Sequence, residues 1–339
     1  MKRFVPKRVF FEPGALEYPL GRELEKKFMD MGIPIEFTTS HNRVTGIPGT
    51  TPKEKYVQAK ASLVVGVRRT LKFQSCKPSA HYQLPLVTSC PGLCEYCYLQ
   101  TTLGPKPINR LYVNLTEILE QAGEYIQERG PEITLFEGAA TSDPIPVEYL
   151  SGALGKTIEF MADQELGRFR FVTKFSDVDS LLEKRHKGHT EIRFSLNTAA
   201  VIHEYEKGTA SMEERIGAAR KTAEAGYPLG FLIAPIFVYP EWKRDYGALL
   251  RKAAESLPEG VFPSFELITH RFTARAKSNI QHVFPDTTLP LDESERKFKY
   301  GQFGYGKYVY PKEVMGEIRE FFEEQIGRYF PESRIAYLV

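Results

Sequence analysis

The chain has 339 residues, with 45 lysines and arginines against 43 aspartates and glutamates, so its net charge at neutral pH is only +2. This length suits one large α/β barrel with additions, and the near-neutral charge gives no overall sign of nucleic-acid binding. The start of the chain has no apolar signal segment, no run approaches a membrane span, and four cysteines, three of them clustered, argue against a disulfide framework. We therefore expect a reduced, cytoplasmic protein with no membrane partner.

The first 78 residues predict a small α/β extension packed on the main domain. A helix is expected over 18–31, where Pro19 suits the first helical position. Strands are expected over 34–38 and 62–68, and the glycines and prolines of 46–52 indicate a turn-rich link between them.

The central region, 79–285, alternates strand-like and helix-like segments. The expected strands are 84–89, 132–136, 169–174, 192–196, 229–238 and 262–268. The expected helices are 116–128, 147–164, 180–187, 211–225 and 242–256. Ser211 and Glu214 have the spacing of a capping box at the start of the fourth helix. About six βα units imply a parallel sheet with helices outside, and they are too few for a closed eight-stranded barrel. The sequence therefore predicts an α/β fold built on a partial, open parallel β/α barrel.

The last region, 286–339, predicts a β-hairpin followed by a helix over 311–328. The hairpin segment, 300–310, interleaves aromatic residues, glycines and a lysine. These side chains either cover core or stack on bases and grip phosphates when a lesion is turned out of a duplex. In the second case, Tyr305 and Lys307 are the tip residues and Arg271 is a nearby phosphate contact.

Cys90, Cys94 and Cys97 form a C-x3-C-x2-C run in the loop after the first expected barrel strand. Iron–sulfur clusters are held by cysteine thiolates. Three thiolates on one loop hold three irons of a 4Fe–4S cluster and leave the fourth iron open to S-adenosylmethionine. The alternative is structural zinc, which needs four closed ligands and would have to recruit Cys76 at an unusual spacing. By itself, Cys76 predicts only a small buried side chain.

Polar and small residues follow the ends of the next barrel strands, which is where βα folds place their chemistry. After the second strand, Ser142 and Asp143 offer acceptors for an ammonium group, and after the third, Lys174 offers a cation for a carboxylate. After the fourth strand, Ser195 and Asn197 suit ribose hydroxyls or the carboxylate, and Ala234 on the fifth suits packing against adenine. The candidate cofactor contacts are Ser142, Asp143, Lys174, Ser195, Asn197 and Ala234. An ordinary turn with Asp143 as a helix cap is the alternative after the second strand.

Together these segments resemble the spore photoproduct lyases, radical S-adenosylmethionine enzymes of endospore-forming bacteria. The segments that carry the resemblance are Ser75–Ala80, Cys90–Tyr98, Phe136–Asp143, Glu266–Phe272 and Gly304–Tyr308. The cysteine loop specifies only the superfamily, and the other segments indicate the lyase.

The resemblance implies a carbon–carbon lyase that repairs DNA. Such an enzyme uses a 4Fe–4S cluster and S-adenosylmethionine to form a 5′-deoxyadenosyl radical, which takes a hydrogen from the thymine dimer 5-thyminyl-5,6-dihydrothymine and so splits it into two thymines. The resemblance also implies double-stranded DNA containing this lesion as a partner and an electron donor of the flavodoxin or ferredoxin type. It implies a monomer located in the spore core or the germinating spore.

One position departs from the family pattern. The family carries a hydrogen-donating cysteine after Glu-Gly-Ala, whereas this chain has Ala140, which has no S–H bond. We expect an engineered Cys-to-Ala change, with a natural variant as the alternative, and Tyr96 and Tyr98 as candidate hydrogen donors. The expected result is normal cofactor cleavage with slow or misdirected completion of repair. The rival functions are a radical enzyme acting on RNA or a protein partner, and a zinc-dependent nucleic-acid-binding module without catalysis.

Overall fold

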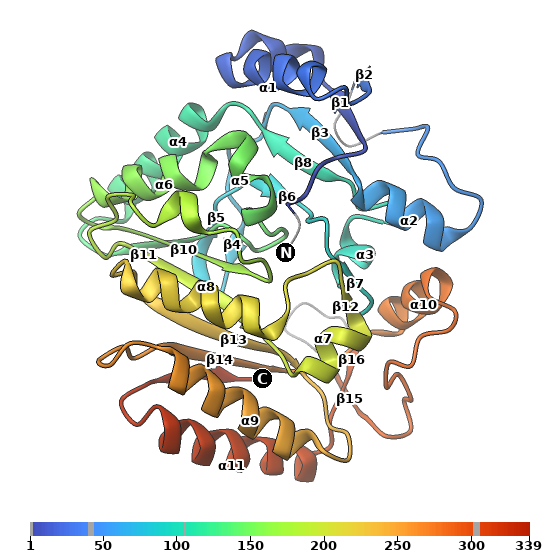
Figure 1. Cartoon of the computed structure of the whole chain (residues 1–339), viewed down its shortest axis with the longest axis vertical. Coiled ribbons are helices and arrows are strands. Elements are labelled where there is room, and N and C mark those ends of the chain that lie inside the picture. The colour runs from blue at the N-terminus through green and yellow to red at the C-terminus, as the bar shows by residue number, and fades with distance from the viewer. Residues whose placement is uncertain (1–2, 40–43, 105, 301–305) are drawn as a thin grey trace.

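The computed structural model describes residues 3–39, 44–104, 106–300 and 306–339. Within these ranges, the main sheet has eight strands in the order β17-β14-β13-β11-β10-β9-β5-β4 (Figure 1). Its parallel strands in chain order are β5 (Ala80–Gln83), β9 (Thr134–Glu137), β10 (Gly167–Thr173), β11 (Thr190–Leu196), β13 (Leu229–Ile236), β14 (Ser264–Thr269) and β17 (Ile335–Leu338). The short strand β4 (Ser75–Cys76) runs antiparallel to β5. This curled, open sheet confirms the predicted partial barrel.

Helices cover the outer face of the sheet (Figure 1). They are α4 (Leu115–Arg129), α6 (Ala153–Ala162), α8 (Met212–Glu224), α9 (Trp242–Ser256) and α11 (Lys312–Tyr329). Apolar side chains from strands and helices form one large core, in which Phe136, Phe171 and Phe194 are fully buried. The predicted capping box is confirmed: the Ser211 hydroxyl accepts from the Glu214 amide at 3.2 Å, and the Glu214 carboxylate accepts from the Ser211 amide at 2.8 Å.

A second sheet carries the N-terminal part of the chain. Its strand order is β2-β1-β3-β8-β6. The strands are β1 (Arg8–Phe11), β2 (Ile35–Phe37), β3 (Ser62–Gly66), β8 (Asn109–Tyr112) and β6 (Val87–Thr88), and helices α1 (Pro19–Asp30) and α2 (Pro52–Lys60) accompany them. Pro19 is the first helical residue of α1, as predicted. Because β6 and β8 follow residue 78, the predicted domain boundary does not coincide with a boundary between sheets, and the three-domain division stays a prediction.

Three predicted elements differ from the structure, each for a local reason. The strand expected over 84–89 is replaced by β5 and β6, because Pro85 between them has no amide hydrogen for a sheet ladder. The helix expected over 147–164 is divided into α5 (Ile145–Ser151) and α6 at Gly152, whose φ of 60° is left-handed.

The helix expected over 180–187 is the third difference, and only the 3-10 turn η2 (Asp179–Leu181) is present. Lys187 and Gly188 have positive φ values of 48° and 72°, so the chain turns there and continues toward β11.

The C-terminal hairpin consists of β15 (Lys297–Tyr300) and β16 (Gly306–Val309), paired antiparallel with Lys299 opposite Lys307. It is joined to the end of β14 through Phe272 and Tyr308, whose main chains exchange two hydrogen bonds of 3.2 and 2.7 Å. Helix α10 (Ala274–Val283), which the sequence did not predict, contacts both β16 and α3 (Leu99–Thr102). The hairpin and the cysteine loop therefore lie on the same side of the molecule (Figure 1). Among the described helices, none combines the length and apolar character needed to cross a bilayer.

Candidate active site

Main-chain pairing holds the three-cysteine loop at its start, where Ser89 bridges to Ser142, and in its middle, at strand β7. Ser89, with a φ of 66°, turns the chain directly before Cys90. Strand β7 (Leu93–Cys94) pairs antiparallel with β12 (Glu206–Lys207), which sets Cys94 opposite Glu206. Cys94 is buried, Cys90 and Cys97 are partly buried, and each lies within electrostatic range of the others. Burial raises the pKa of the Cys90 and Cys94 thiols, so thiolates there need a positive partner such as iron.

The three cysteines do not form a site for a single metal ion in the described part of the chain. Over the part of the chain that the structure describes, no three His, Cys, Asp or Glu side chains converge closely enough to hold one metal ion. A structural zinc site requires such convergence. Each cysteine of a 4Fe–4S cluster binds a different iron, so the sulfur atoms stand farther apart than around one ion.

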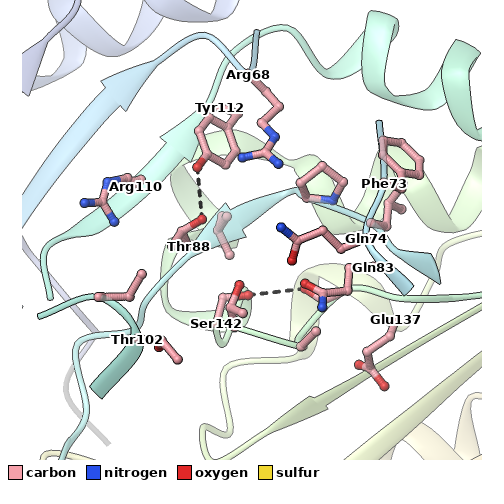
Figure 2. A pocket seen from close by; sticks show the side chains of 17 residues that line it. Arg68, Phe73, Gln74, Gln83, Thr88, Thr102, Arg110, Tyr112, Glu137 and Ser142 are labelled. Carbon is pink, nitrogen blue, oxygen red and sulfur yellow. Dashed lines mark hydrogen bonds between the residues drawn. The ribbon is translucent and has the colours of Figure 1, made fainter. Parts of the chain in front are cut away.

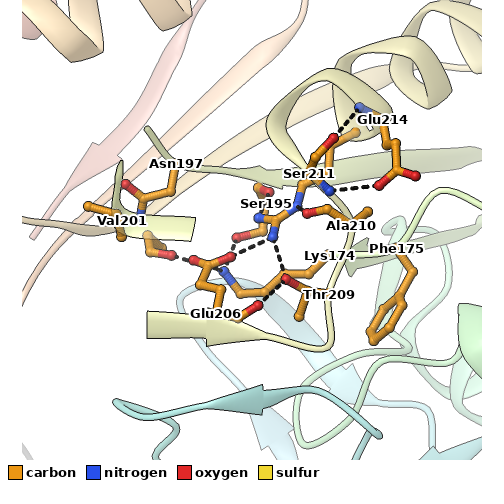
Figure 3. Close-up of polar contacts among 12 residues, drawn as sticks. Lys174, Phe175, Ser195, Asn197, Val201, Glu206, Thr209, Ala210, Ser211 and Glu214 are labelled. Carbon is orange, nitrogen blue, oxygen red and sulfur yellow. Dashed lines mark hydrogen bonds and ion pairs between the residues drawn. The ribbon is translucent and has the colours of Figure 1, made fainter. Parts of the chain in front are cut away.

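A buried ionic network lies beside the cysteine loop (Figure 3). The Glu206 carboxylate accepts from Arg215 at 2.6 Å, from Lys174 at 2.9 Å and from the hydroxyl of Tyr96. Burial alone would raise the pKa of Glu206, but Arg215 and Lys174 outweigh it and lower the pKa to about 2. Glu206 is therefore ionised and bridges two cations, while its main chain pairs with Cys94.

Three predicted cofactor contacts meet at Lys174. Its ammonium donates to the Ser195 hydroxyl at 2.9 Å and to the Ala234 carbonyl at 3.3 Å. Asn197 is fully buried and committed elsewhere: its amide donates to the carbonyl of Pro235 at 2.8 Å, and its Oδ1 accepts from Tyr246 at 2.8 Å. The structure thus brings Lys174, Ser195 and Ala234 together and places Asn197 in the wall behind them.

Asp143 joins two strand ends. Its carboxylate accepts from the Thr173 hydroxyl at 2.9 Å, the Lys174 amide at 2.8 Å and the Ile145 amide at 3.3 Å. Burial raises its pKa to about 6, although these hydrogen bonds oppose the shift. Ser142 donates to the Gly138 carbonyl at 3.3 Å. The Asp143 contacts are those of a turn residue, which was the alternative to a role in ammonium binding.

Ala140 borders a cavity of about 510 Å³ between the two sheets (Figure 2). Ser142, Arg68, Arg110 and Tyr112 also line this cavity.

The carbonyl of Ala140 accepts a hydrogen bond from the hydroxyl of Tyr98, which is otherwise 55% exposed. Tyr98 also lies within electrostatic range of the Cys76 thiol. Ala140, Tyr98 and Cys76 therefore share one neighbourhood.

Cys76 lies opposite Ala80 in the β4–β5 pair at the edge of the barrel. Its thiol is partly buried, and its pKa is raised to about 11, first by burial and then by the carboxylate of Glu137. At neutral pH the side chain therefore keeps its S–H hydrogen. The residue pattern had suggested only a small buried side chain.

A basic surface lies where the hairpin meets β14. Burial lowers the pKa of Lys307, and Arg271 and Lys299 lower it further, which places the three cations near one another. Burial also lowers the pKa of Arg271. The predicted pair Arg271 and Lys307 is thus brought together with Lys299, while Tyr305 lies outside the described residues. Phe298 and Tyr300 of the hairpin are 48% and 74% exposed.

The family model for spore photoproduct lyase matches residues 4–339. The chain belongs to the spore photoproduct lyase family. Curated spore photoproduct lyases from a Geobacillus species and from Clostridium acetobutylicum are 54% and 51% identical to it, with 99% and 98% of each chain covered.

Solved structures of spore photoproduct lyase superpose over the whole chain. One, a complex with dinucleoside spore photoproduct, has a TM-score of 0.96 at 53% identity, with 100% of both chains covered. Another, with the same TM-score, identity and coverage, is a double mutant with bound AdoMet and dinucleoside spore photoproduct. That mutant has Cys changed to Ala at position 140 and Ser changed to Cys at position 76. At the same two numbers, this member of the family has Ala140 and Cys76.

Two further site residues had no clear signal in the sequence. Glu206 and Arg215 are far from the cysteines in sequence and lie in no recognisable motif, and only the pairing of β12 with β7 brings them to the loop.

Proposed function

We propose that this chain splits the spore photoproduct in DNA back into two thymines by radical chemistry, as a carbon–carbon lyase. The observation that carries the proposal is the three-cysteine loop set against the cluster of Lys174, Ser195 and Ala234 at the strand ends. It is supported by the 53% identical neighbour, which holds AdoMet and dinucleoside spore photoproduct.

Cys90, Cys94 and Cys97 fit a 4Fe–4S cluster, and Lys174, Ser195 and Ala234 fit S-adenosylmethionine beside it. When bound, these groups supply the 5′-deoxyadenosyl radical that takes a hydrogen from C6 of the dihydrothymine half of the lesion. The chain itself orients the reactants. Lys174 attracts the methionine carboxylate by its positive charge, while its three N–H groups bond Ser195, Glu206 and Ala234.

The other predicted cofactor contacts have different roles. Ser142 offers a hydroxyl to the methionine end, and Asp143 and Asn197 support the site from behind through their hydrogen bonds to the neighbouring strands.

The hydrogen that ends the reaction comes from Cys76. The thymine radical takes the S–H hydrogen, a C–H bond forms on the thymine methyl group, and a sulfur radical remains on Cys76. Cys76 recovers a hydrogen atom from the Tyr98 hydroxyl, and Tyr98 recovers one from 5′-deoxyadenosine, which had received it from the lesion. The 5′-deoxyadenosyl group so re-formed would rejoin methionine as S-adenosylmethionine, and the bound cluster would take back the electron it had supplied.

Support for this donor comes from the raised pKa of Cys76, which preserves its S–H bond, and from its place in the neighbourhood of Tyr98 and Ala140. Under this assignment Ala140 needs no engineered origin. We assign Tyr96 to anchoring Glu206 through its hydroxyl. Tyr98 is assigned to the relay because it is the tyrosine that neighbours both Cys76 and Ala140.

The basic surface of Arg271, Lys299 and Lys307 contacts phosphates next to the lesion, because two partly buried cations, Arg271 and Lys307, lie there beside the exposed Lys299. Double-stranded DNA is then the partner, and its affinity is sensitive to salt because phosphate contacts release counterions. We propose the same cellular context as for the family: a monomer in the spore core or germinating spore, reduced by a flavodoxin or ferredoxin.

The test is to reconstitute the protein with iron and sulfide under anaerobic conditions, reduce it, and add S-adenosylmethionine and dinucleoside spore photoproduct. The expected product is thymine, accompanied by 5′-deoxyadenosine from turnovers in which the hydrogen is not returned to the cofactor, with Cys94→Ala as the inactive control. A colourless protein that binds zinc would refute the proposal. Formation of 5′-deoxyadenosine without loss of the dimer would instead favour a radical enzyme with another substrate.

A further inference from the structure

Lys60, the last residue of α2, is buried against the main chain of the cysteine loop. The residue is 1% exposed, and its ammonium donates to the Cys90 carbonyl at 2.9 Å and approaches the Ser89 hydroxyl at 3.5 Å. The ring of Tyr56, which is fully buried, lies with its centroid 5.6 Å from the ammonium and closes the other side. Helix α2 thus carries a positive charge to the first residue of the predicted cluster loop.

This ammonium has no carboxylate partner. Throughout the described ranges, no aspartate or glutamate forms a salt bridge with Lys60, although other buried cations such as Arg193 and Arg215 are each paired with glutamate. A buried charge without a counterion is strongly unfavourable. Two neutral oxygen acceptors and an aromatic face compensate only part of that cost.

The proposed cluster would supply the negative charge that Lys60 lacks. Three cysteine thiolates on a 4Fe–4S cluster with two positive core charges give a net charge of −1, and one-electron reduction makes it −2. The sulfur atoms of Cys90, Cys94 and Cys97 lie within electrostatic range of both Lys60 and Tyr56. The Tyr56 hydroxyl also lacks a hydrogen-bond partner of normal geometry in the described part of the chain, even though Gln100 is nearby.

We propose that Lys60 is an electrostatic tuning residue that favours the reduced cluster and so raises its reduction potential. This inference rests on the proposed function, because it requires the cluster. The physical reason is that a fixed positive charge in a dry site stabilises the −2 state more than the −1 state. The potentials of iron–sulfur clusters depend on nearby charge and solvent exposure in the same sense. The N-terminal α/β extension thereby gains a role in the chemistry of the barrel.

The test compares the anaerobically reconstituted full chain with three variants in potentiometric titrations followed by electron paramagnetic resonance. Lys60→Met removes the charge at similar length, Lys60→Arg keeps it, and Lys53→Met removes an exposed charge from the same helix. For Lys60→Met we expect the equilibrium between oxidised and reduced cluster to shift toward the oxidised form by at least about tenfold, equivalent to about 59 mV for one electron. The reduction potentials of Lys60→Arg and Lys53→Met should stay close to that of the parent.

The outcomes separate this inference from the proposed function. If the parent chain binds no iron, the proposed function fails. If Lys60→Met carries a full complement of iron and titrates like the parent, only the tuning role fails. A folded Lys60→Met that loses its iron would assign Lys60 to assembly of the cluster and would also overturn the tuning role. Should Lys60→Met not fold, as judged by circular dichroism, Lys60→Gln replaces it in the same titration.

Discussion

The hydroxyl of Tyr98 donates a hydrogen bond to the carbonyl oxygen of Ala140, so the tyrosine at the end of the cysteine loop touches the position where the family has its hydrogen donor. In the proposed reaction, this contact joins the site where the radical forms to the site where the thymine radical is quenched. Because Ala140 has no S–H bond, the proposed reaction takes its final hydrogen from another side chain. The Cys76 thiol is close enough to the same tyrosine to raise the pKa of its hydroxyl.

The identity of the donor is tested by exchanging the two positions. We expect Cys76→Ser to lower thymine formation by more than about tenfold, because no S–H bond remains near the substrate radical. Ala140→Cys alone should add little, and Ala140→Cys combined with Cys76→Ser should restore most of the yield. Thymine from dinucleoside spore photoproduct is measured by chromatography, with 5′-deoxyadenosine as the control for radical formation.

The opposite pattern would support the expectation, drawn from Ala140 alone, that the chain lacks a hydrogen donor. If the chain has no donor, the parent gives little thymine, Cys76→Ser changes nothing, and Ala140→Cys produces a large gain.

Removing the hydroxyl of Tyr98 should uncouple cofactor use from repair. In Tyr98→Phe, the sulfur radical on Cys76 cannot recover its hydrogen from the tyrosine, and the bond to the Ala140 carbonyl is lost. We expect the ratio of 5′-deoxyadenosine formed to thymine formed to rise severalfold. The ratio is measured in one reaction by chromatography, and an unchanged ratio would remove Tyr98 from the relay. Tyr18→Phe is a matched control, because the Tyr18 hydroxyl bonds Glu117 away from the site.

Neutralising Glu206 should destabilise the fold as well as the site. Glu206→Gln leaves Arg215 and Lys174 without their common carboxylate in a fully buried position, and breaking a buried ion pair costs about 3–5 kcal/mol. The exposed pair of Glu213 and Lys252 provides the comparison, since Glu213→Gln should cost less than about 1 kcal/mol. Free energies of unfolding in urea measure both values, and equal losses would contradict the special role of Glu206.

The same carboxylate predicts a pH dependence of stability. Its pKa is lowered from 4.5 to about 2, since Arg215 and Lys174 outweigh the effect of burial. A depressed pKa means that the contribution of Glu206 to the free energy of unfolding is complete above pH 4.5 and is lost as the pH falls toward 2. The stability of the parent chain should therefore fall across this interval more steeply than that of Glu206→Gln. Parallel curves would show that Glu206 does not contribute.

The basic surface predicts the salt dependence of DNA binding. Lys307→Gln should weaken binding to all duplexes and reduce the slope of log affinity against log salt by about 1, because one phosphate contact is removed. Arg271→Gln should act in the same direction. Lys221→Gln removes an exposed lysine of α8 that is paired with Asp179, and this variant should leave the slope unchanged. Fluorescence anisotropy at several salt concentrations measures these slopes, and equal slopes for all three variants would exclude this surface from the interface.

Local patterns in the chain were enough to predict the partial barrel, the cysteine loop and the capping box at Ser211. Alternating βα segments and a run of three cysteines can each be recognised within a short stretch of sequence, so no distant contact is needed to predict them. The resemblance to the family extended this to the lyase activity and to the unusual Ala140.

Long-range packing decided the rest of the site. Glu206 meets Cys94 through the pairing of β12 with β7, and Lys60 reaches Cys90 because α2 packs against the cysteine loop. The proposed role of Cys76 depends on the β4–β5 pair, which places it near Tyr98. Such contacts depend on sheet register and on the burial of side chains from distant segments, which leave no periodic trace in the sequence.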